Sequence, residues 1–291
     1  MTVQPRVLKL LKELIEVPST SDDEYEIGVF LEKYLKDLGH HVERVPISPG
    51  SRRHNVYAYH GPSRETRTCL TSHMDTVPPH IPLRVEGDVV YGRGACDDKG
   101  PMAAQIMALE ELRAEGYLKP EDASLLFVVG EEKGGPGMIA VNDMGLKWES
   151  VIFGEPTEGK IGLGHKGHFV FELFAHGVAA HSGYPERGRS ANATMVSLIN
   201  DLQMTELPSS SLLGSSTFHC GKIDGGVAYN VLSANCYALC AVRVSADLDG
   251  IEKQVKEMVA KYPSVKFNKR FGYSETLLDH DIDGRAPSMR S

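Results

Sequence analysis

His73 and Asp75 are the first two residues in the sequence whose types and spacing could do chemistry. They end an apolar run just before Pro78, and residues two apart on a strand project from the same face. This spacing predicts an imidazole that binds a metal ion, beside a carboxylate that orients the ring. The pattern is short and a structural histidine is the alternative, so a metal site requires further ligands elsewhere in the chain.

Acidic residues occur near the ends of other expected strands. Glu131 and Glu132 follow one buried strand, and Glu155 follows another. Asp97 and Asp98 lie between a short strand and a helix start. In open α/β sheets, sites form beyond the carboxyl ends of the strands, and carboxylates gathered there repel one another unless cations are present. One imidazole with several carboxylates therefore predicts a zinc centre, with cobalt or manganese as alternatives.

Each acidic signal also has a structural alternative. Asp97 and Asp98 could cap a helix, paired glutamates usually form a solvated loop, and Glu155-Pro156 could end a strand. The occurrence of all these signals in one domain, and not any one of them, favours a metal site.

The hydrophobic pattern predicts the elements that must position these residues. Helices are expected at 5–16, 100–115, 137–143, 190–203 and 248–261, and in the segment that a Ser21-x-x-Glu24 capping box opens and Gly39 ends. Strands are expected at 41–47, 55–59, 68–72, 89–91, 124–129, 151–153, 169–175, 217–223, 231–244 and 265–270, with 124–129 and 151–153 buried. The later elements follow the β-α-β-β-α-β order of a ferredoxin-like domain. We therefore expect an α/β fold with a first domain at 1–165, a second at 166–272 and a last segment at 273–291.

The composition is that of an ordinary globular protein, with 41% hydrophobic and 24% charged residues. The net charge is 31 − 39 = −8, which argues against nucleic acid or an anionic membrane as a partner. No apolar run approaches the ~20 residues of a membrane-spanning helix, and Met1 to Ser19 lacks the apolar core of a signal peptide. Five cysteines without a CxxC pair predict reduced thiols. Together these features predict a cytoplasmic protein.

Four motifs resemble those of the co-catalytic di-zinc aminoacylase/carboxypeptidase family. They are Ser72-His73-Met74-Asp75-Thr76-Val77-Pro78, Gly92-Arg93-Gly94 leading to Asp97, Glu131-Glu132, and Gly154-Glu155-Pro156-Thr157. This family includes acetylornithine deacetylases, succinyl-diaminopimelate desuccinylases and glutamate carboxypeptidases, and the chain is similar to fungal probable carboxypeptidases of the group up to about Gly284. The resemblance implies a zinc-exopeptidase-like catalytic domain with a mixed, largely parallel sheet. It also implies an inserted ferredoxin-like lid that dimerises.

The resemblance implies four metal ligands, which are His73, Asp97, Glu132 and Glu155. Asp97 would bridge two zinc ions, and the peptide bond between Asp97 and Asp98 would be cis. Asp75 would orient the ring of His73. Glu131 would be the general base that takes a proton from water and gives it to the leaving amine.

Residues of the second domain also match the family. His181, in Ala180-His181-Ser182-Gly183, would stabilise the tetrahedral oxyanion at the site of a partner subunit. Asn230 and Arg243 match substrate-binding positions, and a guanidinium suits the carboxylate of an N-acyl amino acid or of a peptide C-terminus. A loop histidine and a surface charge are the structural alternatives for His181 and Arg243. The resemblance implies a homodimer formed through this domain.

The sequence departs from the family pattern near its end. The family completes its site with a late histidine, whereas His280 matches the segment that returns to the catalytic domain. We therefore expect a C-terminally truncated member with a weakly held second metal ion and exposed apolar surface on the catalytic sheet. The predicted function is zinc-dependent hydrolysis of an amide or peptide bond in N-acyl amino acids or C-terminal peptides. An acetylornithine deacetylase-like enzyme and a non-catalytic truncated paralogue acting as a dimerising module are the alternatives.

Overall fold

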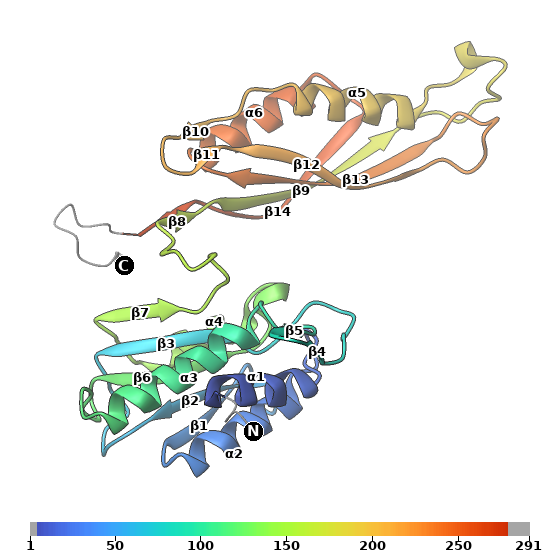
Figure 1. The fold of residues 1–291 in the computed structure, drawn as a ribbon. Coiled ribbons are helices and arrows are strands. Elements are labelled where there is room, and N and C mark those ends of the chain that lie inside the picture. Colours follow the sequence, from blue (N-terminus) through green and yellow to red (C-terminus); the bar gives the residue numbers. More distant parts are fainter. Residues whose placement is uncertain (1–4, 279–291) are drawn as a thin grey trace. The chain divides into compact units, whose positions relative to one another are not determined.

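The computed structural model describes residues 5–278. The chain divides into two compact units, Met1–Ile161 and Gly162–Ser291, which Figure 1 colours from blue to green and from green to red. The sequence-based boundaries at 165 and 272 stay predictions. His280 and most of the predicted last segment lie outside the described residues.

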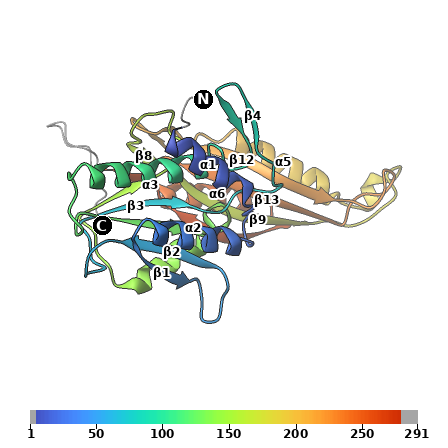
Figure 2. The same cartoon turned by 60° about the horizontal axis from the view of Figure 1, so that its bottom comes forward.

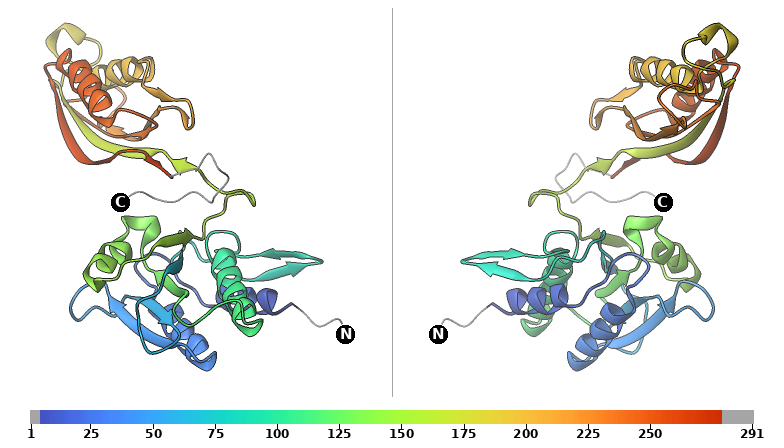
Figure 3. Two further views of the ribbon diagram at one scale, coloured as in Figure 1. Left: turned by 90° about the vertical axis from the view of Figure 1, so that its left-hand side faces the viewer. Right: turned by 90° about the vertical axis from the view of Figure 1, so that its right-hand side faces the viewer.

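The first unit contains one five-stranded sheet with helices on both faces. Its helices are α1 (Arg6–Glu16), α2 (Tyr25–Asp37), α3 (Lys99–Ala114) and α4 (Pro136–Val141). Its sheet strands are β1 (His41–Pro46), β2 (His54–Tyr59), β3 (Thr68–His73), β6 (Ala123–Val128) and β7 (Ser150–Phe153). A separate hairpin of β4 (Arg84–Glu86) and β5 (Val89–Tyr91) projects from the unit (Figure 3).

The sheet is mixed, in the order β1-β2-β6-β3-β7. β1 and β2 pair antiparallel, as do β2 and β6, whereas β3 pairs parallel with both β6 and β7. The register places His73, the last residue of β3, beside Val128, the last residue of β6. The carboxyl ends of the three parallel strands therefore lie together at one end of the sheet, where the segments that follow the strands can meet.

Alternation along the strands builds a core on each face of this sheet. On β2, Val56 and Ala58 pack with α1, α2 and α3, whereas Tyr57 faces the other way. The face covered by α1, α2 and α3 has the larger core, and α1 and α3 lie side by side on it (Figure 2). The opposite face has a smaller core, which includes Leu126 and is covered by residues from Val141 to Trp148. The predicted α/β class is confirmed.

Two local predictions are wrong. Val151, Ile152 and Phe153 of β7 are 39%, 54% and 46% exposed, not buried. In the described part of the chain β7 pairs only with β3, so its apolar residues have neighbours along one edge only. The expected exposed apolar surface is thus present on this strand. The capping box is also wrong, because α2 begins after Glu24 without a side-chain cap and the side chains of Ser21 and Glu24 bind distant residues.

The second unit is an antiparallel sheet with two helices. The sheet order is β12-β13-β9-β14. The long elements are β9 (Gly167–His176), α5 (Ala191–Gln203), β12 (Thr217–Gly225), β13 (Asn235–Val244), α6 (Leu248–Ala260) and β14 (Val265–Tyr273). Two short ladders join β8 (Gly164–His165) to β15 (Thr276–Leu277), and β10 (Ser209–Ser210) to β11 (Gly214–Ser215). The predicted β-α-β-β-α-β order is confirmed.

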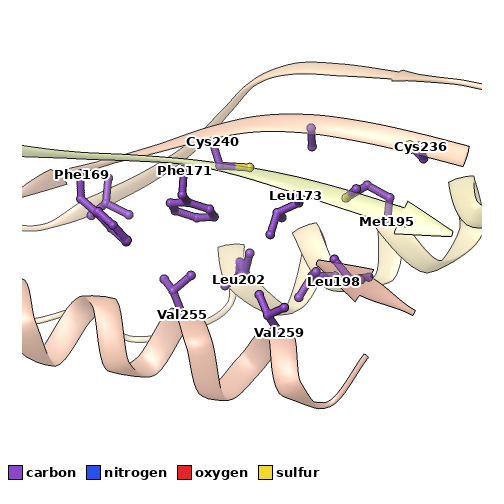
Figure 4. Close-up of a cluster of buried hydrophobic side chains, with 14 of the residues drawn as sticks. Phe169, Phe171, Leu173, Met195, Leu198, Leu202, Cys236, Cys240, Val255 and Val259 are labelled. Carbon is purple, nitrogen blue, oxygen red and sulfur yellow. The ribbon is translucent and has the colours of Figure 1, made fainter. Parts of the chain in front are cut away.

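The core of the second unit lies between this sheet and the helices α5 and α6. Phe169, Phe171 and Leu173 alternate along β9 and point toward the helices (Figure 4). Ser190 and Asp247 cap α5 and α6, because their side chains accept backbone N–H groups of the first helical turns. Among residues 5–278, no helix is long and apolar enough to cross a membrane.

Candidate metal centre

His73 is held so that one ring nitrogen faces a carboxylate. Its side chain is 2% exposed, and its Nδ1 atom lies 2.9 Å from the backbone oxygen of Asp75. A carbonyl oxygen can only accept, so Nδ1 carries a hydrogen in this contact. The other nitrogen, Nε2, lies 2.9 Å from Oδ1 of Asp97. An imidazole lone pair and a carboxylate repel at this distance unless a proton or a metal cation lies between them.

The charges around His73 determine whether its ring is protonated when no metal ion is bound. Burial lowers the pKa of His73, but hydrogen bonding to Asp75 and the negative charges of Asp98, Asp75 and Glu131 outweigh burial and raise the pKa to about 10. The metal-free imidazole therefore carries a proton at neutral pH, and a metal ion must displace this proton.

The carboxylate of Asp75 connects the ends of β3 and β6. Its Oδ1 accepts the backbone N–H of Glu131 at 2.9 Å, and its Oδ2 accepts that of Glu132 at 3.2 Å. The hydroxyl of Ser21 donates to Oδ2 at 2.8 Å. Burial raises the pKa of Asp75, but hydrogen bonds from His73 and Ser21 outweigh it, and the net pKa is lowered. The carboxylate lies 3.4 Å from Nδ1 of His73, so the backbone oxygen of Asp75 is the closer contact to the ring.

Three of the four predicted metal ligands converge at this edge. Ligand atoms of His73, Asp97 and Glu132 lie within 4.8 Å of one another. Burial and the negative charges of Asp97 and Glu131 raise the pKa of Glu132. Burial and the charges of the same groups also raise the pKa of Glu155, which is outside the 4.8 Å group. The carboxylates at this end of the sheet thus carry more negative charge than the positive charge of His73 can balance.

The backbone around the site has two unusual features. The Asp97–Asp98 peptide bond is cis, as expected. Asp98 itself is buried and accepts the backbone N–H of His73 at 3.1 Å, and burial raises its pKa to about 8. A Cβ atom at Gly154 would lie 2.2 Å from Oγ of Ser72 and 2.8 Å from Nε2 of Gln105. Only glycine therefore lets the end of β7 approach β3 closely enough to bring in the residue that follows.

The segment before α2 runs alongside the residues that follow β3. The backbone of Thr76 donates to Ser19 and accepts from Ser21, at 2.9 and 3.0 Å. The hydroxyl of Ser19 donates to the backbone oxygen of Met74 at 2.8 Å. These bonds place the hydroxyl of Ser21 next to Asp75.

Arg53 ties this segment to the loop after β6. Its Nε and Nη2 donate to the two carboxylate oxygens of Glu24 at 2.6 and 2.7 Å, and the Glu24 side chain is fully buried. Its Nη1 donates to Asp22 at 2.9 Å, and Asp22 also pairs with Lys133 of the loop. A Cβ atom at Gly130 would lie 2.9 Å from Nη2, so the guanidinium packs against the turn itself.

Sequence reasoning missed Ser21, Glu24 and Arg53 as supports of the site. Ser21 and Glu24 matched a capping box, which predicts that each side chain binds the other residue's backbone N–H. In the structure they bind Asp75 and Arg53 instead. Arg53 is separated from Glu24 by 29 residues, so no short spacing marks the pair.

The three predicted substrate-site residues of the second unit, His181, Asn230 and Arg243, lie in two separate regions of that unit. Ser182, next to His181, donates its backbone N–H to the backbone oxygen of Asn230 at 2.9 Å. Arg243 is exposed near the far end of β13. At ~3.3 Å per residue, the strand from Asn235 to Arg243 spans about 26 Å. The unit therefore brings His181 and Asn230 together and keeps Arg243 apart from them.

The ring of His181 has a defined tautomer when it is neutral. The backbone N–H of Gly183 donates to its Nδ1 at 3.0 Å. The hydrogen of the neutral ring must then be on Nε2, which can donate to an acceptor.

Comparisons with known proteins identify the family of this chain. Residues 69–277 match the model of peptidase family M20/M25/M40. The chain is 45% identical to a Peptidase M20 domain-containing protein of Schizosaccharomyces pombe over 283 residues, which cover 96% of this chain and 70% of the relative. It is 38% identical to a probable carboxypeptidase of Aspergillus clavatus, with 96% and 73% covered. A solved tripeptidase of Staphylococcus aureus has the same fold, with a TM-score of 0.74, 24% identity, and 92% of this chain and 76% of that chain covered.

The Arg53–Glu24 pair can be tested by substitution. Replacing Arg53 by Met leaves the buried Glu24 carboxylate unpaired, and we expect the free energy of unfolding to fall by about 3 kcal/mol. Urea denaturation measures this change. The matched control is Arg52→Met, since Arg52 only lies over the ring of Tyr25, 4.1 Å from its centroid, and its loss should cost less than about 1 kcal/mol. Equal effects of the two substitutions would contradict the support role.

Zinc binding should depend on pH through His73. Because the metal-free ring is protonated below a pKa of about 10, zinc affinity should rise about tenfold per pH unit between pH 6 and 8, with release of about one proton. Titration calorimetry in two buffers with different ionisation enthalpies measures both quantities. In His73→Ala the pH dependence should flatten, whereas His80→Ala should behave as the wild type. A zinc affinity that does not change with pH would rule out displacement of this proton.

Proposed function

We propose a specific role for this chain, which belongs to peptidase family M20/M25/M40 and is a metal-dependent peptide hydrolase. The proposed role is that of a zinc-dependent carboxypeptidase or deacylase. Its substrates would be peptides with a free C-terminus or N-acyl amino acids. The relatives named as probable carboxypeptidases support this choice. An acetylornithine deacetylase-like specificity is the alternative within the same reaction class.

One observation carries the metal part of the proposal. Nδ1 of His73 donates to a carbonyl, so the proton that a metal ion displaces is on Nε2, which faces the Asp97 carboxylate 2.9 Å away. One imidazole with several carboxylates is a donor set that suits zinc, with cobalt or manganese as alternatives. We assign His73, Asp97, Glu132 and Glu155 as ligands of two ions. A bound divalent ion supplies Lewis acidity, which polarises the scissile carbonyl and acidifies a water molecule.

Glu131 is the proposed general base. Its backbone N–H is fixed by Asp75, while its side chain is exposed beside Glu132. The carboxylate can therefore reach a water molecule at the ligand cluster, accept its proton and deliver this proton to the leaving amine. Removing the carboxylate charge should stop this transfer without removing a metal ligand.

The second unit would bind the substrate and complete a neighbouring active site. In the neutral His181 ring the hydrogen is on Nε2, which can donate to a developing oxyanion, and the exposed guanidinium of Arg243 suits a substrate carboxylate. Their separation along β13 supports the assignment of His181 and Asn230 to one active site and of Arg243 to another. We propose that the two sites belong to the two subunits of a homodimer. We also propose a cytoplasmic location, which the five free cysteines support.

Hydrolysis assays test the proposed role. The zinc-loaded protein should cleave N-acetyl amino acids with a free carboxylate and leave their C-terminal amides intact. Glu131→Gln should lower kcat by about 10²- to 10⁴-fold with zinc content unchanged, since it removes only the base. Absence of turnover in the zinc-loaded wild type would instead favour a non-catalytic dimerising module.

Mixing two inactive variants tests the shared active site. His181→Ala should lower kcat about 100-fold or more because an oxyanion donor is lost. If His181 acts on the partner's site, mixed dimers of His181→Ala and Glu131→Gln contain one intact site. Random exchange of subunits should then restore about a quarter of the wild-type rate.

The matched control mixes Glu131→Gln with a double variant that carries both substitutions. These mixed dimers contain no intact site and should stay inactive. If His181 acts within its own subunit, neither mixture regains activity, and the proposal of a shared site is wrong.

A further inference from the structure

A second group of metal-binding residue types lies at the other end of the first unit's sheet. His40 precedes β1, His60 follows β2, and Glu110 is on α3. The antiparallel register pairs His41 with Tyr59, so His40 and His60 flank the same end of the β1–β2 pair.

This group lies away from the candidate metal centre. Tyr59 pairs with Ser124, near the start of β6, whereas His73 pairs with Val128 at the end of β6. The two groups therefore lie at opposite ends of the same strand and share no residue.

The distances within the group are close to those of a metal site. Nε2 of His40 lies 2.9 Å from Oε1 of Glu110, and Nε2 of His60 lies 4.0 Å from the same oxygen. One ligand atom from each residue lies within 4.8 Å of the others. Tetrahedral zinc with bonds of 2.0–2.1 Å separates its ligand atoms by about 3.3 Å. Side-chain shifts of about 1 Å would therefore bring all three atoms into place.

The burial of the group leaves imidazole nitrogens without partners. The side chain of His40 is fully buried, and those of His60 and Glu110 are 13% and 11% exposed. In the described part of the chain, Nδ1 of His40 and Nε2 of His60 are buried and make no hydrogen bond. Such atoms are costly and uncommon in folded proteins. Burial also lowers the pKa of His60 to about 4, so its ring is neutral and can bind a metal ion.

The surroundings leave room for an ion and for one further ligand. A cavity of about 310 Å³ adjoins the group and is lined by His60, Glu110, Arg113 and Pro120. Arg113 is the opposing feature, because its guanidinium pairs with Oε1 of Glu110. A metal ion would compete with this guanidinium for the same carboxylate oxygen.

We propose that His40, His60 and Glu110 bind a divalent transition-metal ion, with zinc as the best match to two imidazoles and one carboxylate. The ion would join the turn between α2 and β1, the end of β2 and helix α3. The cavity would supply a water molecule as the fourth ligand. This site is separate from the hydrolytic centre and is assigned from different residues.

Equilibrium dialysis of the full chain against Zn²⁺, with zinc measured by mass spectrometry, tests the proposal. The wild type should bind one more ion per chain than His60→Ala. The difference between these proteins reports this site alone, because both retain the hydrolytic centre. His41→Ala is the matched control, since it removes the neighbouring histidine outside the group and should bind as much zinc as the wild type.

Arg113→Met provides a variant with the opposite expected effect. Removing the competing guanidinium should strengthen binding at this site by about tenfold, comparable to the effect of groups next to other metal sites. Zinc should also raise the melting temperature of His41→Ala more than that of His60→Ala. Equal zinc content in the wild type and His60→Ala, or no gain of affinity in Arg113→Met, would overturn the proposal. The second outcome decides the question even if His60→Ala does not fold.

Discussion

The candidate site depends on one buried carboxylate, that of Asp75. It accepts the backbone N–H groups of Glu131 and Glu132 and the hydroxyl of Ser21. The backbone oxygen of the same residue accepts Nδ1–H of His73. Asp75 therefore sets the positions of three chain segments and the orientation of the ring. A carboxylate that accepts several hydrogen bonds stays charged, and a negative charge behind the ring increases the basicity of Nε2 toward a cation.

The mixed sheet explains how one residue can organise segments so far apart in sequence. The parallel strands β3, β6 and β7 bring their following loops to one edge. β2 runs antiparallel to β6, with Val56 opposite Phe127, so the start of β2 lies beside the end of β6. Arg53, just before β2, thereby reaches the turn at Gly130. A fully parallel sheet would place Arg53 at the opposite end of the strands, and Glu24 would then lose the guanidinium that neutralises it.

The sequence allowed prediction of those features that depend on local spacing. Buried apolar runs located β3 and β6, and their ends located His73 and Glu132, because chain direction fixes where a strand's last side chain lies. The roles of Ser21 and Glu24 could not be predicted, since a capping pattern cannot exclude a tertiary partner that binds the same side chains more favourably. The exposure of β7 could not be predicted either, because an apolar run shows that burial is favourable but does not show whether a neighbouring strand is present to provide it.

Charge balance separates the structural carboxylates of the first unit from those of the candidate site. Glu24 and Asp22 pair with Arg53, and Glu32 pairs with Arg44. In the described part of the chain, no lysine or arginine pairs with Asp97, Glu131, Glu132 or Glu155, and Asp97 pairs only with an imidazole.

The positive charge already paired with the carboxylates also predicts which of the two metal-binding groups binds zinc more tightly. At the hydrolytic centre a metal ion supplies positive charge that the protein does not, and it displaces only a proton from His73. At the distant group Arg113 already neutralises Glu110, so an ion there must displace a guanidinium and gains less Coulombic energy from the carboxylate. We infer that limited zinc occupies the hydrolytic centre first, because among the described residues no lysine or arginine competes for its carboxylates.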